Sequence, residues 1–532
     1  MIRRLSLSRR AVAWLCMLLL LLAVLPMYVL SLYNHAFYDD LGFSLLTHDA
    51  WTQTGSPVAV LEAAVRNTVG IRQTWEGTYA TSFVSALQPA VFGEGAYWVT
   101  TFILLTVFLL AVGYFLKQTL GGLYGMDRTA VWTVFGILGF VLTQFVPDAA
   151  EAFYWFNGGV AYTLLWSVML FAAGVWIRFD QTQGRLRSAL TYLLLVVLTV
   201  LVGGAKYSTA LFAVLLATAF TGLAFVRRRP KRFAFLSLTV LLIACLLFSM
   251  AAAGNAVRAK TLSGGMSAPK AVLEALYFGL ALIGHSFSLP LLAAMALLVP
   301  LSIPALKQSG VRFSHPVWTT VFSVGLFCVQ LASTLYTGNY LGDGRVLNTY
   351  HYTLVMMLAQ LVLYWTGYFI RRSERGLAPL AVEAVPAATP TDDLAALPAL
   401  SDEERNEALP KALFSEQRLK AVTLLLVAAM LVAGCVAYRP DGAPSYGPQN
   451  MAGGSALRSV LSGEAAAFDR AMDERERILN DTTLTDVALQ PILQAPASFM
   501  GDAVQSDNVD YVLRLYADYY DKATVTIAGN GE

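Results

Sequence analysis

The chain has 532 residues, of which 57% are hydrophobic and only 14% are charged. Apolar stretches of about twenty residues recur along it, and this is the length needed to cross a bilayer, so the composition excludes an ordinary soluble enzyme. The formal net charge is +2, and basic residues gather in alternate connections rather than on one face, which excludes nucleic acid as the expected partner. The four cysteines lie inside apolar stretches at unrelated spacings and indicate packing residues, not a disulfide framework or metal site.

The apolar stretches predict an all-α polytopic membrane protein with about eleven transmembrane helices. In chain order these are residues 11–33, 97–117, 129–146, 160–177, 188–203, 208–226, 233–250, 285–301, 317–336, 352–370 and 421–438. Arginines at positions 3, 4, 9 and 10 and the basic residues of alternate connections place the N-terminus in the cytoplasm by the positive-inside rule. A crossing at 269–284 would reverse every later loop, so we expect a surface or re-entrant helix there.

Four parts follow from this topology. Residues 1–370 form the transmembrane core, with a long first outer loop at 34–96 in which Ser56 and Pro57 suit the start of a helix lying along the membrane surface. Residues 371–418 contain an Ala- and Pro-rich stretch with scattered acids and predict a flexible cytoplasmic linker. The last transmembrane helix lies within 419–438, and residues 439–532 predict a small extracytoplasmic α+β domain.

Two adjacent acids, Asp39 and Asp40, follow the first helix on the predicted outer side. A carboxylate at this place is suited to accept a proton from a sugar hydroxyl. We favour Asp39 as this base and Asp40 as an orienting residue or weak metal ligand, and a solvated helix end is the alternative interpretation. The pair also offers hard oxygen ligands for Mg²⁺ or Mn²⁺, although nothing in the sequence requires a metal.

A lipid-phosphate leaving group would need cationic partners at the same membrane boundary. The outer segments supply four candidates, for each of which headgroup anchoring is the alternative: Arg72, Lys206, Arg258 and Arg345.

Residues expected to bind the sugar or the acceptor combine aromatic faces, an acid, amides and an imidazole. They are Glu151, Tyr154, Trp155, Asn157, Asn255 and His351. An interfacial aromatic belt explains Tyr154 and Trp155 equally well, and His351 suits a hydrogen-bonding role at a helix end. Gly158 and Gly159 would allow close backbone approach to a ligand.

The first-loop aspartates resemble those of the GT-C superfamily of membrane glycosyltransferases, and the motifs at 154–159, 254–258 and 468–475 resemble an uncharacterised bacterial family related to GtrII-type glucosyltransferases. This resemblance implies a GT-C-like core in the bacterial cytoplasmic membrane and an inverting transfer of a hexose from a polyprenyl-phosphate donor to a cell-surface glycan or other acceptor at the outer leaflet. It also implies that the catalytic aspartate lies in the first outer loop. The alternatives are a transporter or flippase of lipid-linked glycans and a noncatalytic glycan-assembly subunit.

Overall fold

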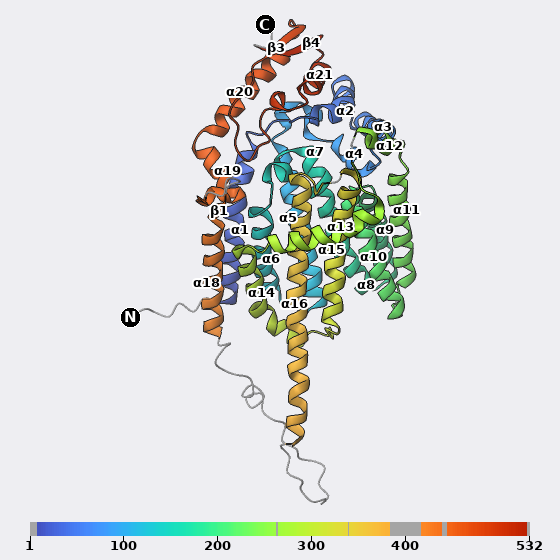
Figure 1. Ribbon diagram of the computed structural model, residues 1–532, viewed down its shortest axis with the longest axis vertical. Helices are drawn as coiled ribbons and strands as arrows, with labels where there is room; N and C mark the ends of the chain where they lie inside the picture. Colours follow the sequence, from blue (N-terminus) through green and yellow to red (C-terminus); the bar gives the residue numbers. More distant parts are fainter. Residues whose placement is uncertain (1–7, 262–263, 339, 384–415, 439–443, 529–532) are drawn as a thin grey trace, which may run out of the picture.

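The computed structural model describes residues 8–261, 264–338, 340–383, 416–438 and 444–528. Within these ranges, nine helices are long and apolar enough to cross a membrane. They form a bundle that is covered at one end by shorter elements (Figure 1). The prediction of an all-α polytopic membrane protein is therefore confirmed, while the number of eleven spans remains a prediction.

The long apolar helices of the bundle follow one another along the chain, and the longest connection between them joins α1 to α5. They include α1 (Arg9–Ser31), α5 (Val99–Leu116), α8 (Leu165–Gln181), α9 (Arg185–Gly203), α10 (Tyr207–Val226), α11 (Arg232–Met250), α14 (Leu289–Gln308), α15 (Pro316–Gly338) and α16 (Gly344–Glu383). Two further predicted spans are shorter here: α6 (Arg128–Gln144) has 17 residues, and α18 (Glu416–Gly434) has a described apolar part of Leu425–Gly434.

The packing of α6 against α1 places α6 inside the bundle. Gly136 and Gly139 of α6 face α1, and a Cβ at Gly136 would lie 2.8 Å from the backbone of Cys16. Small residues allow helices to approach closely in a membrane protein. The side chain of Asp127 caps α6 by accepting a hydrogen bond from Ala130 N at 3.0 Å.

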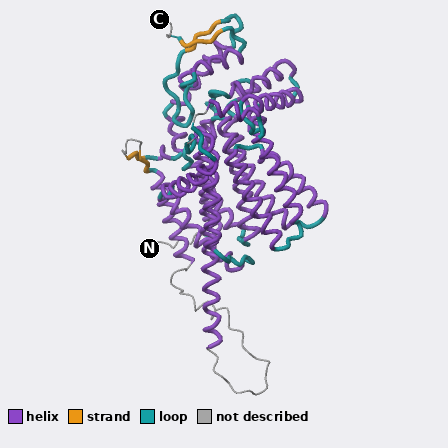
Figure 2. The backbone as a smooth tube through the Cα atoms, turned by 45° about the vertical axis from the view of Figure 1, so that its right-hand side comes forward, coloured by secondary structure: helices purple, strands orange, loops and turns teal. Residues whose placement is uncertain are grey.

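One end of the bundle, which we call the capped end, is covered by elements that do not cross it (Figure 1). They are α2 (Asp40–Thr54), α3 (Pro57–Thr74), α4 (Tyr79–Ser85), α12 (Ala253–Thr261) and the C-terminal part, residues 452–528. Helices α2 and α3 pack on each other and lie across the bundle axis (Figure 2). Ser56 caps α3 as predicted, and Val58, Leu61 and Val65 are exposed along one of its faces, which suits a helix at a membrane surface.

The C-terminal part consists of α19 (Ala452–Leu461), α20 (Glu464–Leu479), α21 (Val509–Tyr519) and a parallel pair of strands, β3 (Asp486–Leu489) and β4 (Thr524–Ile527). Its apolar side chains join those of the bundle in one hydrophobic cluster. The ring of Phe499 meets that of Tyr154 edge to face, with centroids 5.3 Å apart. The C-terminal part therefore completes its core against the membrane helices.

The basic connections that the sequence places on one side of the membrane do lie at one end of the bundle, opposite the capped end. Arg9 is 3.6 Å from Asp127, and Arg229 is 3.2 Å from Asp180. Ser309 Oγ donates to Leu123 O at 3.5 Å. These contacts join connections that are distant in sequence. Connections that touch one another must lie on the same side of the membrane, so the contacts agree with the grouping of the basic residues.

The helices of the structure end at other residues than expected on both sides of the predicted linker. Helix α16 continues to Glu383, so residues 371–383 of the predicted linker are helical, and residues 384–415 of it lie outside the described residues. The stretch after Ile370 holds Arg, Glu, Leu and Ala, which favour helix strongly enough to extend it. Helix α18 ends at Gly434, and β1 (Val436–Tyr438) pairs antiparallel with β2 (Pro444–Tyr446), because glycine ends the helix and a β-branched residue follows.

The segment that we expected at the surface or re-entrant forms α13 (Ala268–His285), which packs on α15. A Cβ at Gly279 would lie 2.5 Å from Cys328 Sγ, so the two helices are in close contact. The remaining short elements are η1 (Pro89–Phe92), η2 (Glu94–Ala96), η3 (Lys117–Leu123), η4 (Ala150–Tyr154), α7 (Phe156–Gly159), η5 (Val160–Leu164), η6 (Pro448–Asn450) and η7 (Ala503–Gln505).

Candidate functional site

Asp39 and Asp40 mark the start of α2 at the capped end. Asp39 occupies the N-cap position but makes no capping hydrogen bond with its side chain. Aspartate at an N-cap ordinarily accepts a hydrogen bond from the first turn of its helix. The carboxylate of Asp39 is directed elsewhere, so helix capping does not explain its presence.

Asp40 is completely buried and is held by protein groups on both oxygens. Oδ2 accepts hydrogen bonds from the Tyr97 hydroxyl and from Phe37 N, and Oδ1 accepts one from Asn157 N at 3.2 Å. Burial and the neighbouring charge of Asp39 raise the pKa of Asp40 to about 8. These contacts make Asp40 a residue that positions the first loop, and they leave it out of reach of a substrate.

Asp39 is partly exposed, and its Oδ1 accepts a hydrogen bond from Asn157 Nδ2 at 3.0 Å. Burial raises the pKa of Asp39 above its ordinary value, while the Asn157 hydrogen bond and the charge of Arg345 oppose that rise. Oδ2 of Asp39 accepts no hydrogen bond from the described residues. A carboxylate with a raised pKa and a free oxygen is suited to accept a proton.

Asn157 lies between two π-helical segments, η4 and η5. π-Helical turns are rare and occur often at functional sites, because the wider turn redirects side chains. Here they let Asn157 contact both aspartates, one through its backbone N–H and the other through its side chain. The glycines that follow it pack closely against protein groups: a Cβ at Gly159 would lie 2.3 Å from Leu104.

Arg345 and Glu151 form an ion pair beside this segment, with Arg345 Nη1 2.8 Å from Glu151 Oε1. The backbone N–H of Arg345 donates to the other oxygen of Glu151, and Arg345 Nη2 donates to Asp343 at 2.6 Å. The guanidinium lies 5.1 Å from the ring centroid of Trp155. One cation is thus balanced by two carboxylates.

A second charged cluster is centred on the buried Glu76, which follows α3. Lys206 Nζ donates to both Glu76 oxygens at 2.7 Å, and Arg258 donates to Oε2. Burial alone would raise the pKa of Glu76, but these two cations lower it to about 2. Here two cations face one carboxylate, so the cluster is cationic.

Glycines allow the backbone of α12 to reach the end of α3. A Cβ at Gly254 would lie 2.6 Å from Trp75 N, and one at Gly77 would lie 1.8 Å from Ser249 O. Asn255 fastens the same junction, because its side chain accepts from Gly77 N at 3.0 Å and donates to Ser249 O at 2.9 Å. The predicted sugar-binding Asn255 therefore has a positioning role in this structure.

Arg72 lies at the last turn of α3 with its guanidinium 3.6 Å from the ring centroid of Phe248 on α11. Arg258 lies in the same way over Trp75, at 5.1 Å. Phe248 is 55% exposed on the outside of the bundle. At this edge of the capped end, the cationic side chains therefore lie beside apolar side chains that are exposed on the outer surface of the bundle.

The two charged clusters act on the same carboxylate. Arg345 and Lys206, one from each cluster, both oppose the rise in the pKa of Asp39. Cations of both clusters therefore influence the carboxyl group of Asp39, and the site roles expected for these residues remain predictions.

Two other predicted residues lie away from this region. Tyr154 is buried and donates a hydrogen bond to Met27 O at 3.1 Å, so it is a packing residue. His351 lies on α16 with its ring edge-on to Tyr352. Neither side chain has a described contact with Asp39, and the sugar-binding prediction gains no support for them.

Sequence reasoning did not assign a role to Glu76, Tyr97 or Asp343, although all three contact predicted site residues. Glu76 and Asp343 were recognisable as acids in outer connections, but a lone acid gives no spacing signal. Tyr97 lies at the start of an apolar stretch, where a tyrosine suits an interfacial belt. Only its hydrogen bond to Asp40 distinguishes Tyr97 from an ordinary tyrosine at the membrane boundary.

The donor set does not fit a metal shared by Asp39 and Asp40, because Asp40 is buried and its carboxylate accepts three protein hydrogen bonds. Among the residues that the structure describes, three potential ligands come together at His35, Asp469 and Asp473 instead. His35 there contacts two carboxylates, Asp469 and Glu94, at 3.0 and 3.6 Å. We assign no metal to the aspartate pair and derive no step through one.

In comparisons with known proteins, the chain matches no family model, no curated protein and no solved structure.

Proposed function

We propose that the protein is an inverting glycosyltransferase that moves a hexose from a polyprenyl-phosphate donor to a surface glycan or a related hydroxyl acceptor. The observation that carries this proposal is the environment of Asp39. Its carboxylate has a free oxygen and a raised pKa, and one cation from each of the two clusters acts on that pKa. Sugar transfer from a lipid phosphate needs a proton acceptor and a cationic leaving-group site close together. The basic connections at the opposite end of the bundle support an extracytoplasmic capped end.

The charge balance favours one cluster as the phosphate site. Arg345 already faces Glu151 and Asp343, and a phosphate placed there would be repelled by two carboxylates. Lys206 and Arg258 share only Glu76, so a net positive charge remains. Arginine and lysine retain further N–H donors in these contacts and can bind phosphate oxygens while they hold Glu76.

The same cluster is placed well for a lipid. Phe248, Leu247 and Met250 of α11 are all more than half exposed, and Arg72 lies directly over Phe248. A prenyl chain has no polar group and is expected to lie along such a surface within the bilayer. Its phosphate would then meet Arg258, Lys206 and Arg72 at the boundary.

The proposed reaction is a single displacement. Asp39 Oδ2 accepts the proton of an acceptor hydroxyl as that oxygen forms a bond to the anomeric carbon of the donor hexose. The bond from the anomeric carbon to the phosphate oxygen breaks, and polyprenyl phosphate leaves with the bonding electron pair. Arg258 and Lys206 stabilise the charge that develops on the leaving phosphate, an effect of about 3 kcal/mol for one well-placed donor.

The experiment that tests this function is an incubation of the purified full-length protein in nanodiscs with a panel of polyprenyl-phosphate hexoses, with donor consumption followed by mass spectrometry. We expect the wild-type protein to consume at least one donor. Asp39→Asn keeps the shape of the side chain and removes its basicity, so the rate should fall by about 10²- to 10⁴-fold. Asp49→Asn on the same helix is the matched control and should retain full activity.

Donor consumption by Asp39→Asn at the wild-type rate would refute the base assignment. Movement of an intact lipid-linked sugar across a sealed vesicle, with no consumption of any donor, would identify a transporter or flippase instead. Loss of glycan assembly only when the whole chain is removed, with both aspartates dispensable, would identify a noncatalytic subunit.

A further inference from the structure

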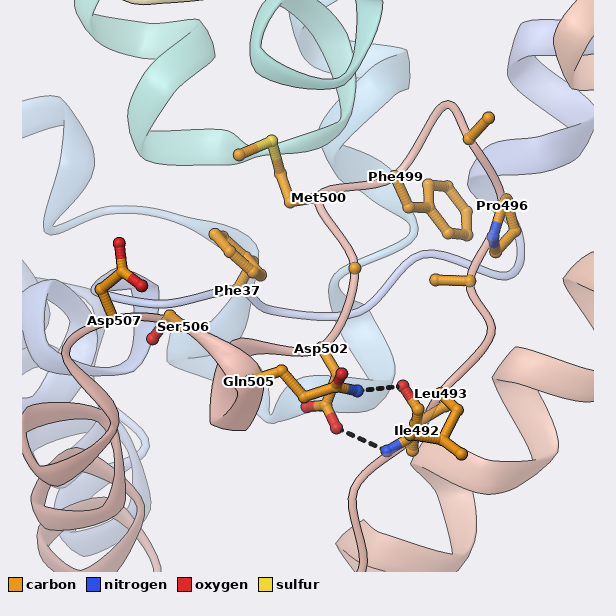
Figure 3. A pocket seen from close by; sticks show the side chains of 13 residues that line it. Phe37, Ile492, Leu493, Pro496, Phe499, Met500, Asp502, Gln505, Ser506 and Asp507 are labelled. Atoms are coloured by element: carbon orange, nitrogen blue, oxygen red, sulfur yellow. Dashed lines mark hydrogen bonds between the residues drawn. The ribbon is translucent and has the colours of Figure 1, made fainter.

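An open cavity of about 650 Å³ lies between the C-terminal part and the segment that leads to Asp39. One wall is Phe37, and the rest comes from the connection at residues 492–507 (Figure 3). A cavity of this size is typical for sites that bind small organic molecules. It lies outside the charged cluster around Glu76 that we assign to the donor phosphate.

The frame of the cavity is held by a buried ion pair. Arg475 of α20 binds both oxygens of Asp502, at 2.6 and 2.8 Å. The same carboxylate accepts a hydrogen bond from Ile492 N at 2.7 Å (Figure 3) and another from Val504 N at 3.2 Å. Asp502 therefore fixes both ends of the connection, and the cavity is formed before a ligand arrives, which reduces the entropy that binding would lose.

Polar groups remain available in this frame. Asp507 lines the cavity, is exposed, and makes no ion pair or hydrogen bond with any residue that the structure describes. Gln505 donates from Nε2 to Ile492 O at 2.5 Å, which leaves Oε1 as an acceptor. Unpaired acceptors of this kind suit a ligand that carries several hydroxyl groups.

Apolar side chains complete the wall. Phe37 lines the cavity (Figure 3), and its ring meets that of Trp155 edge to face with centroids 5.8 Å apart. Aromatic faces beside carboxylate and amide oxygens are suited to sugar rings, which have apolar C–H faces and polar edges. Phe37 is also only two residues before Asp39, so a ligand in the cavity lies next to the catalytic loop.

We infer that this cavity binds the acceptor as a saccharide of more than one ring, with Asp507 and Gln505 accepting hydrogen bonds from its hydroxyl groups. That the saccharide is the acceptor rests on the proposed function. The inference adds the chemical class of the acceptor, which would bind on the side of the site that faces away from the lipid. The C-terminal part would then select the glycan, while the membrane helices bind the donor.

The test measures saccharide binding without a donor. Purified full-length protein in nanodiscs is applied to an array of bacterial surface-polysaccharide fragments, and the best fragment is then titrated in solution. Two variants address the cavity: Asp507→Asn removes the acceptor charge, and Ala497→Trp fills the space from an exposed position in the wall. Their matched controls are Asp510→Asn on α21 and Ala467→Trp on α20, which do not line the cavity.

We expect the wild-type protein and both controls to bind the same fragment, and both cavity variants to bind it about tenfold more weakly or worse. Equal binding by the cavity variants and the controls would overturn the inference, and so would an array to which the wild-type protein binds no saccharide. Saccharide binding that depends on the cavity in a protein that consumes no donor would refute the proposed function and leave the saccharide site standing. Donor consumption together with unchanged saccharide binding in the cavity variants would support the proposed function and refute the saccharide site in this cavity.

Discussion

Asn157 Nδ2 lies 3.0 Å from Asp39 Oδ1 and joins two connections that are 118 positions apart in the sequence. The backbone N–H of the same asparagine binds Asp40. One residue therefore determines how both aspartates are presented, and its amide supports the ionised form of Asp39.

Replacing Asn157 with aspartate should shift the pH dependence of sugar transfer. Asn157→Asp removes a hydrogen-bond donor and adds a like charge, so the pKa of Asp39 should rise further. Because Asp39 must be ionised to accept a proton, the acidic limb of the rate profile should move to higher pH by about one unit. Initial rates between pH 4 and 9 would measure the shift, and Asn480→Asp on the exposed end of α20 is the control. An unchanged profile in the Asn157 variant would contradict the role of Asp39 as base.

Removing Arg258 should impair use of the donor much more than use of the acceptor. Arg258→Ala removes a cation that we place on the leaving phosphate, so kcat/KM for the donor should fall by about a hundredfold. Lys260→Ala on the same helix removes an exposed charge that has no described contact with Glu76 and should have little effect. Steady-state kinetics with each substrate varied in turn would separate the two effects. Equal kinetics in the two variants would leave headgroup anchoring as the role of Arg258.

Glu76 should make the capped end sensitive to acid. The pKa of this carboxyl is lowered from 4.5 to about 2 by Lys206 and Arg258, against the effect of burial. A group with a lowered folded-state pKa contributes stability above its unfolded value, and that contribution is lost as pH falls from about 4.5 through 2.

Glu76→Gln leaves two partly buried cations without their carboxylate partner and should destabilise the protein by about 3 kcal/mol at neutral pH. Its stability should then depend less on pH below 4.5 than that of the wild-type protein. Thermal unfolding in detergent between pH 2 and 7 would measure both effects, with the exposed Glu62→Gln on α3 as control. Parallel pH dependences for the wild-type protein and Glu76→Gln would show that Glu76 is not the titrating group.

His35 should make the attachment of the C-terminal part sensitive to base. Burial alone would lower the pKa of His35, but the carboxylates of Asp469 and Glu94 raise it from 6.5 to about 9. A group with a raised folded-state pKa contributes stability that is fully present below its unfolded value and is lost as pH rises through the folded value. The contribution of His35 to docking should therefore disappear between pH 6.5 and about 9.

Limited proteolysis of the C-terminal part at pH 6 and pH 9.5 would measure this change, and we expect about tenfold faster cleavage at the higher pH. His35→Gln cannot become charged, so its cleavage should be fast at both pH values. His285→Gln, an exposed histidine of α13, should behave like the wild-type protein. A wild-type cleavage rate that does not change with pH would exclude the switch.

Local features of the sequence were sufficient to predict the helices and the grouping of their connections. Hydropathy depends on each residue and its neighbours, so the apolar stretches locate the bundle helices, and the Ser56 and Pro57 signal locates α3. The gathering of basic residues predicts which connections share an end of the bundle, and contacts such as that of Arg229 with Asp180 agree. Helix ends were less predictable, as α16 shows, because helix propensity continues past the apolar part.

Only the tertiary structure decided what each charged residue does. Asp39 and Asp40 are chemically identical neighbours, and one is buried against Tyr97 while the other keeps a free oxygen. Glu76 meets cations 130 and 182 positions away. Hydrophobicity and capping are properties of a short stretch of chain and can be recognised in it, whereas ion pairs and pKa values depend on which distant segments share a buried environment, and this is set only when the helices pack.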